Sequence, residues 1–360
     1  MSDKVRVLVV DDSALMRKLI PQILQTDDSI EVVGTAMDGS FGLKKIDELR
    51  PHVVTLDLDM PRMDGMETLR QITRIHKIPA IIVSSHSTAG ASATFKALAL
   101  GAFDFVAKPR DAAQAQMHEI AAELISKIKA AANAGTVRVP FSMTATPGQT
   151  VKLAKQARGA ANKIVAIGIS TGGPNALQYL LSQLPSDFSG SIVVVQHMPE
   201  GFTEMFARRL DECCAIEVKE AQSGDLLLAG RALICPGNRH IRVKRMPMGN
   251  IVVLADDPRV NGHRPSVDVL FRSVADFGSS AIGLLMTGMG DDGADALGEI
   301  KRTGGMTIAQ SEDSCVVFGM PKAAIDKGHA IRVVSLDALA NTLQAQCGSN
   351  HQRAREAAKV

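Results

Sequence analysis

Short apolar runs alternate with amphipathic segments along most of this 360-residue chain. In the first third, the mostly apolar runs occupy residues 5–10, 31–34, 53–56, 80–83 and 103–106. Such runs are typical of strands that are buried on both faces of a sheet. The segments between them have helical patterns, such as Ala14–Leu24 with Ser13 as its N-cap. Strands that alternate with helices form right-handed βαβ units, so we expect an α/β fold with a parallel sheet.

The same alternation returns after Lys163 and predicts a second domain. Apolar runs cover 164–169, 191–196, 281–286 and 306–309, and helical patterns cover 174–184, 203–210, 267–274 and 294–301. The stretch 226–254 is richer in strand patterns, with turns expected at Pro236–Gly237 and Gly249–Asn250. At roughly 150 residues per domain, the chain length fits two domains. We expect the second domain to be doubly wound around a mostly parallel sheet.

The segment between the two patterned regions has a different composition. No acidic residue occurs from Leu124 to Ser186, and the part from Ala130 to Asn162 consists largely of small and polar residues. We interpret it as a flexible linker, and divide the chain into domains at 1–125 and 161–350, a linker at 126–160 and a polar tail at 351–360. The linker is either a solvated tether or a weakly basic strip that meets an acidic partner. Its scattered cations are Arg138, Lys152, Lys155 and Arg158.

The composition argues against several classes of protein. The 40 Lys and Arg residues nearly balance the 38 Asp and Glu residues, and aromatic residues make up 3% with no Trp, which disfavours nucleic-acid binding. The five cysteines form no Cys-x-x-Cys pair, so neither a disulfide framework nor a zinc site is expected. No signal-peptide pattern follows Met1, and the uncharged stretch from Ile164 to Ser186 contains Gly and Pro, unlike a membrane span. We therefore expect a cytoplasmic protein without membrane insertion.

Charged and hydroxyl side chains follow the apolar runs of the first domain. Asp11 and Asp12 follow the first run, Asp57 the third, Ser84 the fourth and Lys108 the fifth. The carboxyl ends of parallel strands meet at one edge of a sheet, where ligands bind. Three carboxylates there repel one another unless a hard cation such as Mg²⁺ lies between them. A carboxylate beside Mg²⁺ can attack a phosphoryl donor, and a lysine and a hydroxyl can then bind the phosphoryl oxygens.

In the second domain, a serine, a histidine and an aspartate each follow a different apolar run. Ser170 lies in a Gly-x-Ser-x-Gly string on a glycine-rich turn before a helix, His197 follows 192–196, and Asp291 and Asp292 follow 281–286. A triad of these types performs acyl transfer, with either aspartate able to orient the imidazole. The order Ser, His, Asp differs from the α/β-hydrolase order, so such a triad would have arisen on a different sheet.

Three other functions stay open on the residues alone. A binding-only adaptor would not need Ser170, His197 and Asp292 together. A DNA-binding regulator predicts a compact basic helix-turn-helix after the linker, whereas about 200 residues of α/β pattern follow. A nucleotide-dependent oxidoreductase needs Gly at position 170 in its fingerprint, where Ser stands.

The first domain resembles the response-regulator receiver family. The motifs are Val9–Ser13, Leu56–Gly65, Val83–Ser85 and Phe105–Pro109, within residues 4–125. The resemblance implies a flavodoxin-like fold and phosphorylation of Asp57 by a chemotaxis histidine kinase of a two-component system. It implies a Mg²⁺ site formed by Asp11, Asp12, Asp57 and the backbone carbonyl of Asp59. The positions that change on phosphorylation are matched by Ser84, Phe105 and Lys108.

The second domain resembles the chemotaxis protein-glutamate methylesterase family of the CheB type. The segments are Gly168–Pro174, Val195–Pro199, Cys235–Gly237, His263–Asp268, Thr287–Gly293 and Ser314–Pro321, together with Gln310. The resemblance implies a serine carboxylesterase with Ser170 as nucleophile, His197 as general base and Asp292 as triad acid. Thr171 and Met289 match positions that help to form the oxyanion hole.

The resemblance also implies the substrate and its control. Glutamate γ-methyl esters on methyl-accepting chemoreceptors would be hydrolysed, and certain receptor glutamines deamidated, for chemotactic adaptation. Phosphorylation of Asp57 would release a crevice that the receiver blocks. We expect a monomer that requires Mg²⁺ in the receiver and no cofactor in the catalytic domain. Asp291 is expected to point to solvent, and His240, His263 and Arg264 are interpreted as rim or structural residues.

Overall fold

The computed structural model describes residues 4–85, 87–108, 114–134 and 159–348. These residues form two compact units, which lie before and after position 144 of the chain. Each unit has its own parallel sheet, and each is described separately below.

The first unit is a five-stranded parallel sheet in the order β2-β1-β3-β4-β5. Helix α1 contacts α5, and α2 contacts α3. Ser13 caps α1 by accepting a hydrogen bond from the backbone N–H of Met16, as the sequence predicted. The strands are β1 (Val5–Val10), β2 (Ile30–Ala36), β3 (Val53–Leu56), β4 (Ala80–Ser84) and β5 (Asp104–Ala107). The helices are α1 (Ala14–Leu24), α2 (Gly39–Leu49), α3 (Gly65–Gln71) with a π-helical turn at Ile72–His76, α4 (Thr88–Ala99) and α5 (Gln114–Ala134).

The second unit contains a seven-stranded parallel sheet in the order β14-β13-β12-β6-β7-β9-β8. A separate antiparallel hairpin, β10–β11, packs against α8. The strands are β6 (Ile164–Ile169), β7 (Ser191–Gln196), β8 (Glu217–Glu220), β9 (Arg231–Ile234), β10 (His240–Met246), β11 (Gly249–Ala255), β12 (Ala281–Leu285), β13 (Met306–Gln310) and β14 (Arg332–Val334). The helices are α6 (Gly173–Ser182), α7 (Phe202–Cys213), α8 (Val267–Ala275), α9 (Ala294–Arg302), α10 (Met320–Asp326) and α11 (Leu336–Cys347).

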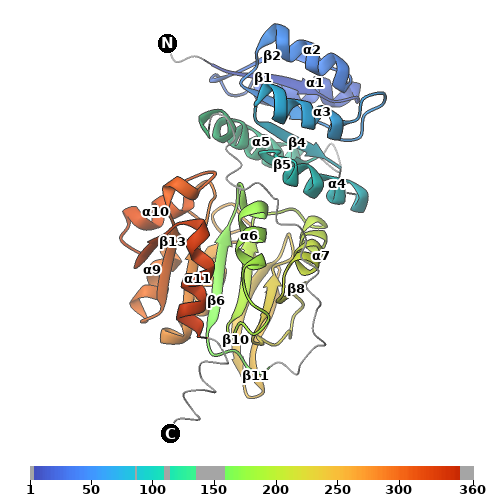
Figure 1. The fold of residues 1–360 in the computed structure, drawn as a ribbon. Coiled ribbons are helices and arrows are strands. Elements are labelled where there is room, and N and C mark those ends of the chain that lie inside the picture. The colour runs from blue at the N-terminus through green and yellow to red at the C-terminus, as the bar shows by residue number, and fades with distance from the viewer. Residues whose placement is uncertain (1–3, 86, 109–113, 135–158, 349–360) are drawn as a thin grey trace. The chain divides into compact units, whose positions relative to one another are not determined.

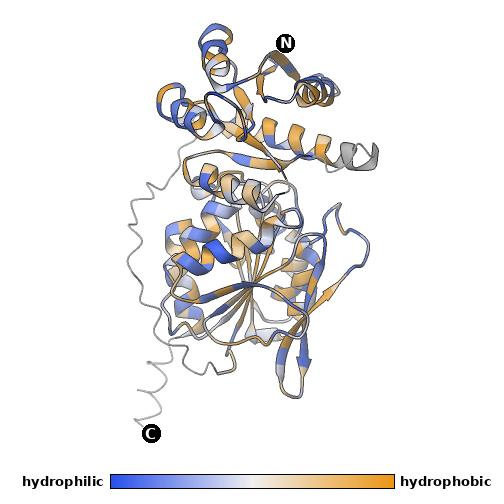
Figure 2. Ribbon diagram, turned by 90° about the vertical axis from the view of Figure 1, so that its right-hand side faces the viewer, coloured by the Kyte–Doolittle hydropathy of each residue, from blue (hydrophilic) through white to orange (hydrophobic). Residues whose placement is uncertain are grey.

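Helices cover the second sheet in two groups. Helix α6 contacts α7 and α11, whereas α9 contacts α8 and α10 (Figure 1). Every residue of the central strands β6, β7 and β12 is buried. Figure 2 shows these central strands coloured as hydrophobic, while the helices around them carry both colours. The central strands therefore provide a rigid base for the loops at their carboxyl ends.

Most predicted strands are confirmed, and the differences lie at the margins of the fold. The hairpin turn is at residues 247–248, two positions before the predicted Gly249–Asn250. Helix α5 continues to Ala134, so the first nine positions of the predicted linker 126–160 are helical. Most of the rest of the linker and the tail 351–360 lie outside the described residues, as do the four linker cations and Pro109. No helix among the described residues is long and apolar enough to span a membrane.

Candidate active site

Ser170 and His197 follow neighbouring strands and are brought side by side by the strand register. Ile169 at the end of β6 pairs with Gln196 at the end of β7. The backbone N–H of His197 donates to the Ile169 carbonyl at 3.1 Å, so the two strands stay together one residue beyond the sheet. The Gln196 side chain donates from Nε2 to the carbonyls of both Ser170, at 3.0 Å, and His197, at 3.1 Å. This glutamine fixes the two turns relative to each other, a role that the sequence analysis did not assign.

A glycine allows a third strand end to lie against Ser170. The backbone N–H of Ser170 donates to the Thr287 carbonyl at 3.0 Å, just beyond β12. A Cβ atom built on Gly288 would lie 2.8 Å from the Ser170 Cβ and 2.4 Å from the Met320 sulfur. Real Cβ atoms do not approach other atoms so closely, so the position requires glycine. The serine is consequently held on a tight turn before α6, and Gly172 there has a positive φ of 73°.

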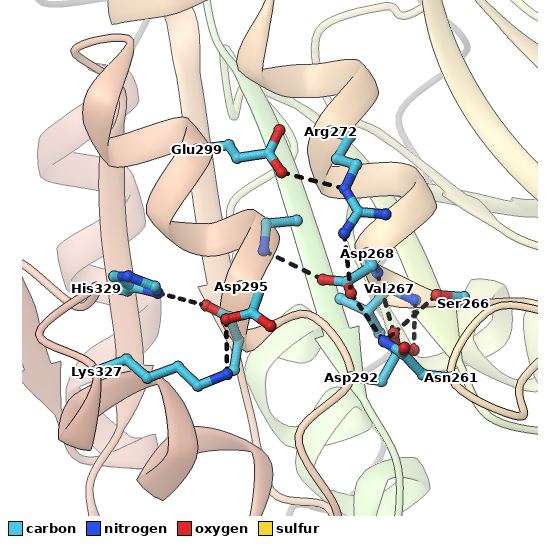
Figure 3. A network of polar contacts seen from close by, with 12 residues as sticks. Asn261, Ser266, Val267, Asp268, Arg272, Asp292, Asp295, Glu299, Lys327 and His329 are labelled. Atoms are coloured by element: carbon cyan, nitrogen blue, oxygen red, sulfur yellow. Dashed lines mark hydrogen bonds and ion pairs between the residues drawn. The ribbon is translucent and has the colours of Figure 1, made fainter.

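Asp292 lies in a buried pocket of hydrogen-bond donors. It is 1% exposed, and its Oδ2 lies 2.9 Å from His197 Nε2. Oδ2 also accepts from the Val267 N–H at 2.7 Å, and Oδ1 from the Ser266 hydroxyl at 2.7 Å. Asn261 Nδ2 donates to Oδ1 at 3.2 Å, which Figure 3 shows together with Ser266 and Val267. The donors Val267 and Ser266 stand at the beginning of α8, where the helix dipole favours a negative charge.

These donors keep Asp292 ionised. Burial alone raises the pKa of its carboxyl, because a buried charge loses its hydration. The hydrogen bond and positive charge of His197, with the donors Ser266 and Val267, outweigh burial and lower the pKa of Asp292 to about 2. A carboxylate that is ionised at neutral pH accepts hydrogen bonds and cannot donate one. His197 Nε2 must therefore carry a proton.

The orientation of the His197 ring leaves its other nitrogen available. In the neutral ring, protonation of Nε2 leaves Nδ1 as the basic atom. Nδ1 is buried, and within the described ranges no side chain or backbone group hydrogen-bonds to it. In the serine-protease template, Nδ1 faces the acid and Nε2 faces the serine. Here Asp292 is bound through Nε2, so in a triad of these residues Nδ1 would be the nitrogen left for the serine, the opposite sense to that template.

The remaining residues that the sequence singled out lie around this centre. Thr171 is buried beside Ser170, and its carbonyl accepts from the Thr287 hydroxyl at 3.0 Å. Met289 follows the close-packed Gly288. Asp291 is exposed, as expected, although its neighbour Asp292 is buried.

The loop between β11 and α8 supplies residues that sequence reasoning did not connect with the triad. Asn261 and Ser266 both bond to Asp292, and Asn261 also donates to Asp268 Oδ2 at 2.8 Å. The imidazole of His263 stacks on that of His197. The string His263–Asp268 was noted in the sequence, but it follows no buried strand directly, so no pattern indicated where its side chains point.

In the first unit, three carboxylates gather at the carboxyl edge of the sheet. Oxygen atoms of Asp11, Asp12 and Asp57 lie within 4.8 Å of one another. Asp11 and Asp57 are buried, and Lys108 Nζ lies 3.2 Å from Asp11 Oδ2 and 2.7 Å from Asp57 Oδ2. Burial raises the pKa of both carboxyls, although the Lys108 ammonium opposes the rise. Asp59 adds no carboxylate to this group; its backbone N–H donates to Asp57 Oδ1 at 3.3 Å.

The donor set fits a magnesium ion. All three side chains offer hard oxygen atoms, which are the ligands that Mg²⁺ prefers. Two of the carboxylates are buried, which disfavours their charged form, and a divalent cation would offset that cost. The carbonyl of Asp59 stays a predicted fourth ligand.

Ser84 and Phe105, which match positions expected to change on phosphorylation, are both buried. Ser84 Oγ accepts from the Thr94 hydroxyl at 2.6 Å and lies 3.2 Å from the Gly90 carbonyl, to which it donates. Phe105 is 3% exposed and packs edge-on against Phe95, with ring centroids 6.3 Å apart. Both residues therefore contact α4, so a conformational change at either residue would also displace that helix.

Comparisons with known proteins agree with this architecture. The CheB methylesterase model matches residues 165–343, and the response regulator receiver domain model matches residues 7–120. A protein-glutamate methylesterase/protein-glutamine glutaminase of Koribacter versatilis is 63% identical over 351 residues, which cover 95% of this chain and 96% of that protein. A relative of the same name from Symbiobacterium thermophilum is 43% identical over 97% of this chain and 99% of its own length.

Solved structures include a relative of the second unit. The crystal structure of the Thermotoga maritima CheB methylesterase catalytic domain matches with a TM-score of 0.50 and 39% identity. The match covers 51% of this chain and 98% of that domain. With its two α/β units and relatives that align along nearly its full length, this chain belongs to the CheB methylesterase family and carries an N-terminal response-regulator receiver domain.

Proposed function

We propose that this chain hydrolyses glutamate γ-methyl esters on methyl-accepting chemoreceptors and deamidates specific receptor glutamines. The names of its relatives, protein-glutamate methylesterase and protein-glutamine glutaminase, support both reactions. The observation that carries the proposal is the convergence of Ser170, His197 and Asp292 at the carboxyl ends of three neighbouring parallel strands. A binding-only adaptor has no need of an ionised carboxylate bonded to a histidine at that edge.

In the proposed reaction, Ser170 Oγ attacks the ester carbonyl while His197 Nδ1 takes the hydroxyl proton. Asp292 stabilises the imidazolium that forms and keeps the proton on Nε2. Nδ1–H then donates its proton to the departing methoxide, and methanol leaves. Water, deprotonated by Nδ1, then attacks the acyl-enzyme; the bond to Ser170 Oγ breaks, Nδ1–H returns the proton to Oγ, and the glutamate carboxylate is released. Deamidation follows the same steps with ammonia as the leaving group, and backbone N–H groups near Thr171 and Met289 would bind the oxyanion.

We propose that the receiver controls this reaction through Asp57. A histidine kinase would donate the phosphoryl group, and Asp57 Oδ2 is already paired with Lys108 Nζ at 2.7 Å, the cation expected to bind the new phosphoryl oxygens. A bound Mg²⁺ would supply positive charge to the phosphoryl oxygens, held by Asp11, Asp12 and Asp57 with the Asp59 carbonyl. The added charge would shift Ser84 and Phe105, and with them the receiver's conformational balance. The crevice would then open to receptor.

Methanol release from methylated receptor membranes tests the proposal. Wild type and Ser170→Ala are compared with and without acetyl phosphate and Mg²⁺. Release that rises with the phosphodonor and vanishes in Ser170→Ala would support both the hydrolysis by Ser170 and its control by the receiver. No release from folded wild type under any condition would favour a binding-only regulator instead.

A further inference from the structure

The imidazole of His263 lies flat against that of His197. The ring centroids are 3.8 Å apart and the ring planes differ by 4°. Aromatic pairs in proteins more often adopt offset or edge-on arrangements with centroids about 4.5–7 Å apart. A parallel contact at 3.8 Å is van der Waals contact over much of the ring face. The His197 ring therefore cannot tilt toward His263.

Hydrogen bonding alone fixes only one side of the His197 ring. Nε2 is held by Asp292 at 2.9 Å, whereas Nδ1 has no hydrogen-bond partner among the described residues. A hydrogen bond at one nitrogen fixes that atom but tolerates tilting of the ring about it. Tilting would move Nδ1, the nitrogen that takes the Ser170 proton in the proposed reaction. Contact with a flat surface over one ring face restrains this motion.

A tight turn holds His263 in place. The backbone N–H of Val260 donates to the His263 carbonyl at 3.1 Å, and that of His263 donates back to the Val260 carbonyl at 2.9 Å. The two residues between them, Asn261 and Gly262, have φ values of 52° and 77°. Positive φ at both central positions with the sequence Asn-Gly is typical of a two-residue type I′ turn. The turn is compact, and its ends are fixed by both hydrogen bonds.

The same turn is anchored to the triad acid. Asn261 Nδ2 donates to Asp292 Oδ1 at 3.2 Å and to Asp268 Oδ2 at 2.8 Å, and the latter contact ties the turn to α8. Figure 3 shows the Asn261 amide lying between these two carboxylates. One short segment thus contacts both the acid and the base. A shift of the turn would move the stacking ring and a donor to Asp292 together.

We propose that His263 is a positioning residue that holds the His197 ring plane so that Nδ1 faces Ser170. The proposal rests on the proposed role of His197 as the general base. What His263 contributes is a planar surface, not a proton, so another flat ring of similar size serves as well. An apolar side chain of similar volume without a plane fills the space but does not restrain the tilt.

Three substitutions in the full-length, phosphodonor-activated protein separate these contributions. His263→Phe keeps a flat ring, whereas His263→Leu and His263→Met fill the space without one. Because a misplacement of about 1 Å can cost about 10²-fold in rate, we expect kcat for methanol release to fall at least about tenfold in the Leu and Met variants. KM should change little, because substrate binding does not depend on the tilt. The Phe variant should stay within a few fold of wild-type kcat.

Two further measurements make the result decisive. Thermal melting identifies an unstable variant, and Leu and Met differ in shape, so a loss common to both does not come from one packing fault. The rate at which a fluorophosphonate labels Ser170 reports activation of the nucleophile without receptor, and it should fall with kcat in Leu and Met but not in Phe. Wild-type kcat in both non-planar variants, or a Phe variant as slow as Leu, would overturn the proposal. A wild-type protein that neither releases methanol nor is labelled at Ser170 would instead overturn the proposed function itself.

Discussion

At the scale of single residues, the buried carboxylate of Asp292 organises the centre. It accepts from His197, Ser266, Val267 and Asn261 while being 1% exposed. A charge this deeply buried is costly unless it is paired and hydrogen-bonded. The donors offset that cost and also set the direction in which the carboxylate faces the imidazole.

Replacing Asp292 by Asn tests its role in orienting His197. The amide cannot take the place of an ionised acceptor for Nε2–H and does not stabilise an imidazolium. By analogy with the corresponding change in serine proteases, kcat should fall by about 10⁴-fold with little change in KM. Methanol release from receptor membranes measures it, with fluorophosphonate labelling of Ser170 as a second readout. A loss below tenfold would contradict the assignment of Asp292 as the triad acid.

The lowered pKa of Asp292 also predicts how stability depends on pH. Its folded-state pKa of about 2 lies below the ordinary value of 3.8, so ionisation favours the folded state. The contribution is fully present above about pH 4 and is lost as the pH falls toward 2. With about 1.4 kcal/mol per pKa unit, it amounts to about 2 kcal/mol. Urea unfolding measures the free energy of unfolding of wild type and of Asp292→Asn from pH 6 to pH 2. Over this range wild type should lose about 2 kcal/mol more than the variant. The prediction is refuted if the two free energies fall in parallel as the pH is lowered.

At the scale of elements, the sequence predicted the centre of each sheet better than its edges. Strands β6, β7 and β12 are continuous apolar runs because both their faces are covered, and that pattern is visible without any structure. The edge strands β8, Glu217–Glu220, and β14, Arg332–Val334, are short and partly exposed, so they carry no such run and were not predicted. Helices α10 and α11 were missed as well.

The same distinction explains what could be predicted of the site. Ser170, His197 and Asp292 follow central strands, whose carboxyl ends must meet at one edge, so their convergence followed from the topology. Asn261, His263 and Ser266 come from the loop between β11 and α8. Their side chains reach the triad through a turn and a helix start, and residue spacing carries no information about side-chain direction.

Gly288 offers a test of how strand ends position the nucleophile. A methyl group there would lie 2.8 Å from the Ser170 Cβ and 2.4 Å from the Met320 sulfur, so Gly288→Ala must displace both. Methionine adapts readily, but the Ser170 turn is part of the sheet edge and must also shift. We expect kcat to fall at least about tenfold while the fold persists, since small displacements of reacting groups are costly. Ser170 labelling and circular dichroism measure the two effects; normal labelling in a folded variant would count against a close-packed turn.

At the scale of the two units together, the proposed function makes phosphorylation of Asp57 in the first unit control the reaction in the second. Asp11 and Asp57 are buried, Asp12 is exposed, and the Lys108 ammonium is paired with both buried carboxylates. A divalent ion is thus part of the proposed phosphorylation, whereas no step of the proposed ester hydrolysis involves one.

Metal removal should separate the two reactions. In EDTA, acetyl phosphate should no longer stimulate methanol release, and basal release should be unchanged. Asp57→Asn should give the same result in the presence of Mg²⁺, because the acceptor oxygen is lost. Phos-tag electrophoresis measures the phosphorylated fraction directly. Basal activity that falls in EDTA would point instead to a metal in the catalytic unit.

Deleting residues 1–140 tests whether the receiver restrains the catalytic unit. The second unit has its own buried core, built from strands, the β10–β11 hairpin and helices α8–α10, so it is expected to fold alone. A relative's catalytic domain, 39% identical, has been crystallised as a separate domain. If the unphosphorylated receiver blocks the crevice, the truncated protein should release methanol faster than unstimulated full-length protein and should not respond to acetyl phosphate. Full-length Asp57→Asn is the matched control, because it also lacks the response but keeps the receiver, and it should stay at the slow basal rate. Equal basal rates in the truncated and full-length proteins would mean that phosphorylation activates by assisting receptor binding and not by removing a block.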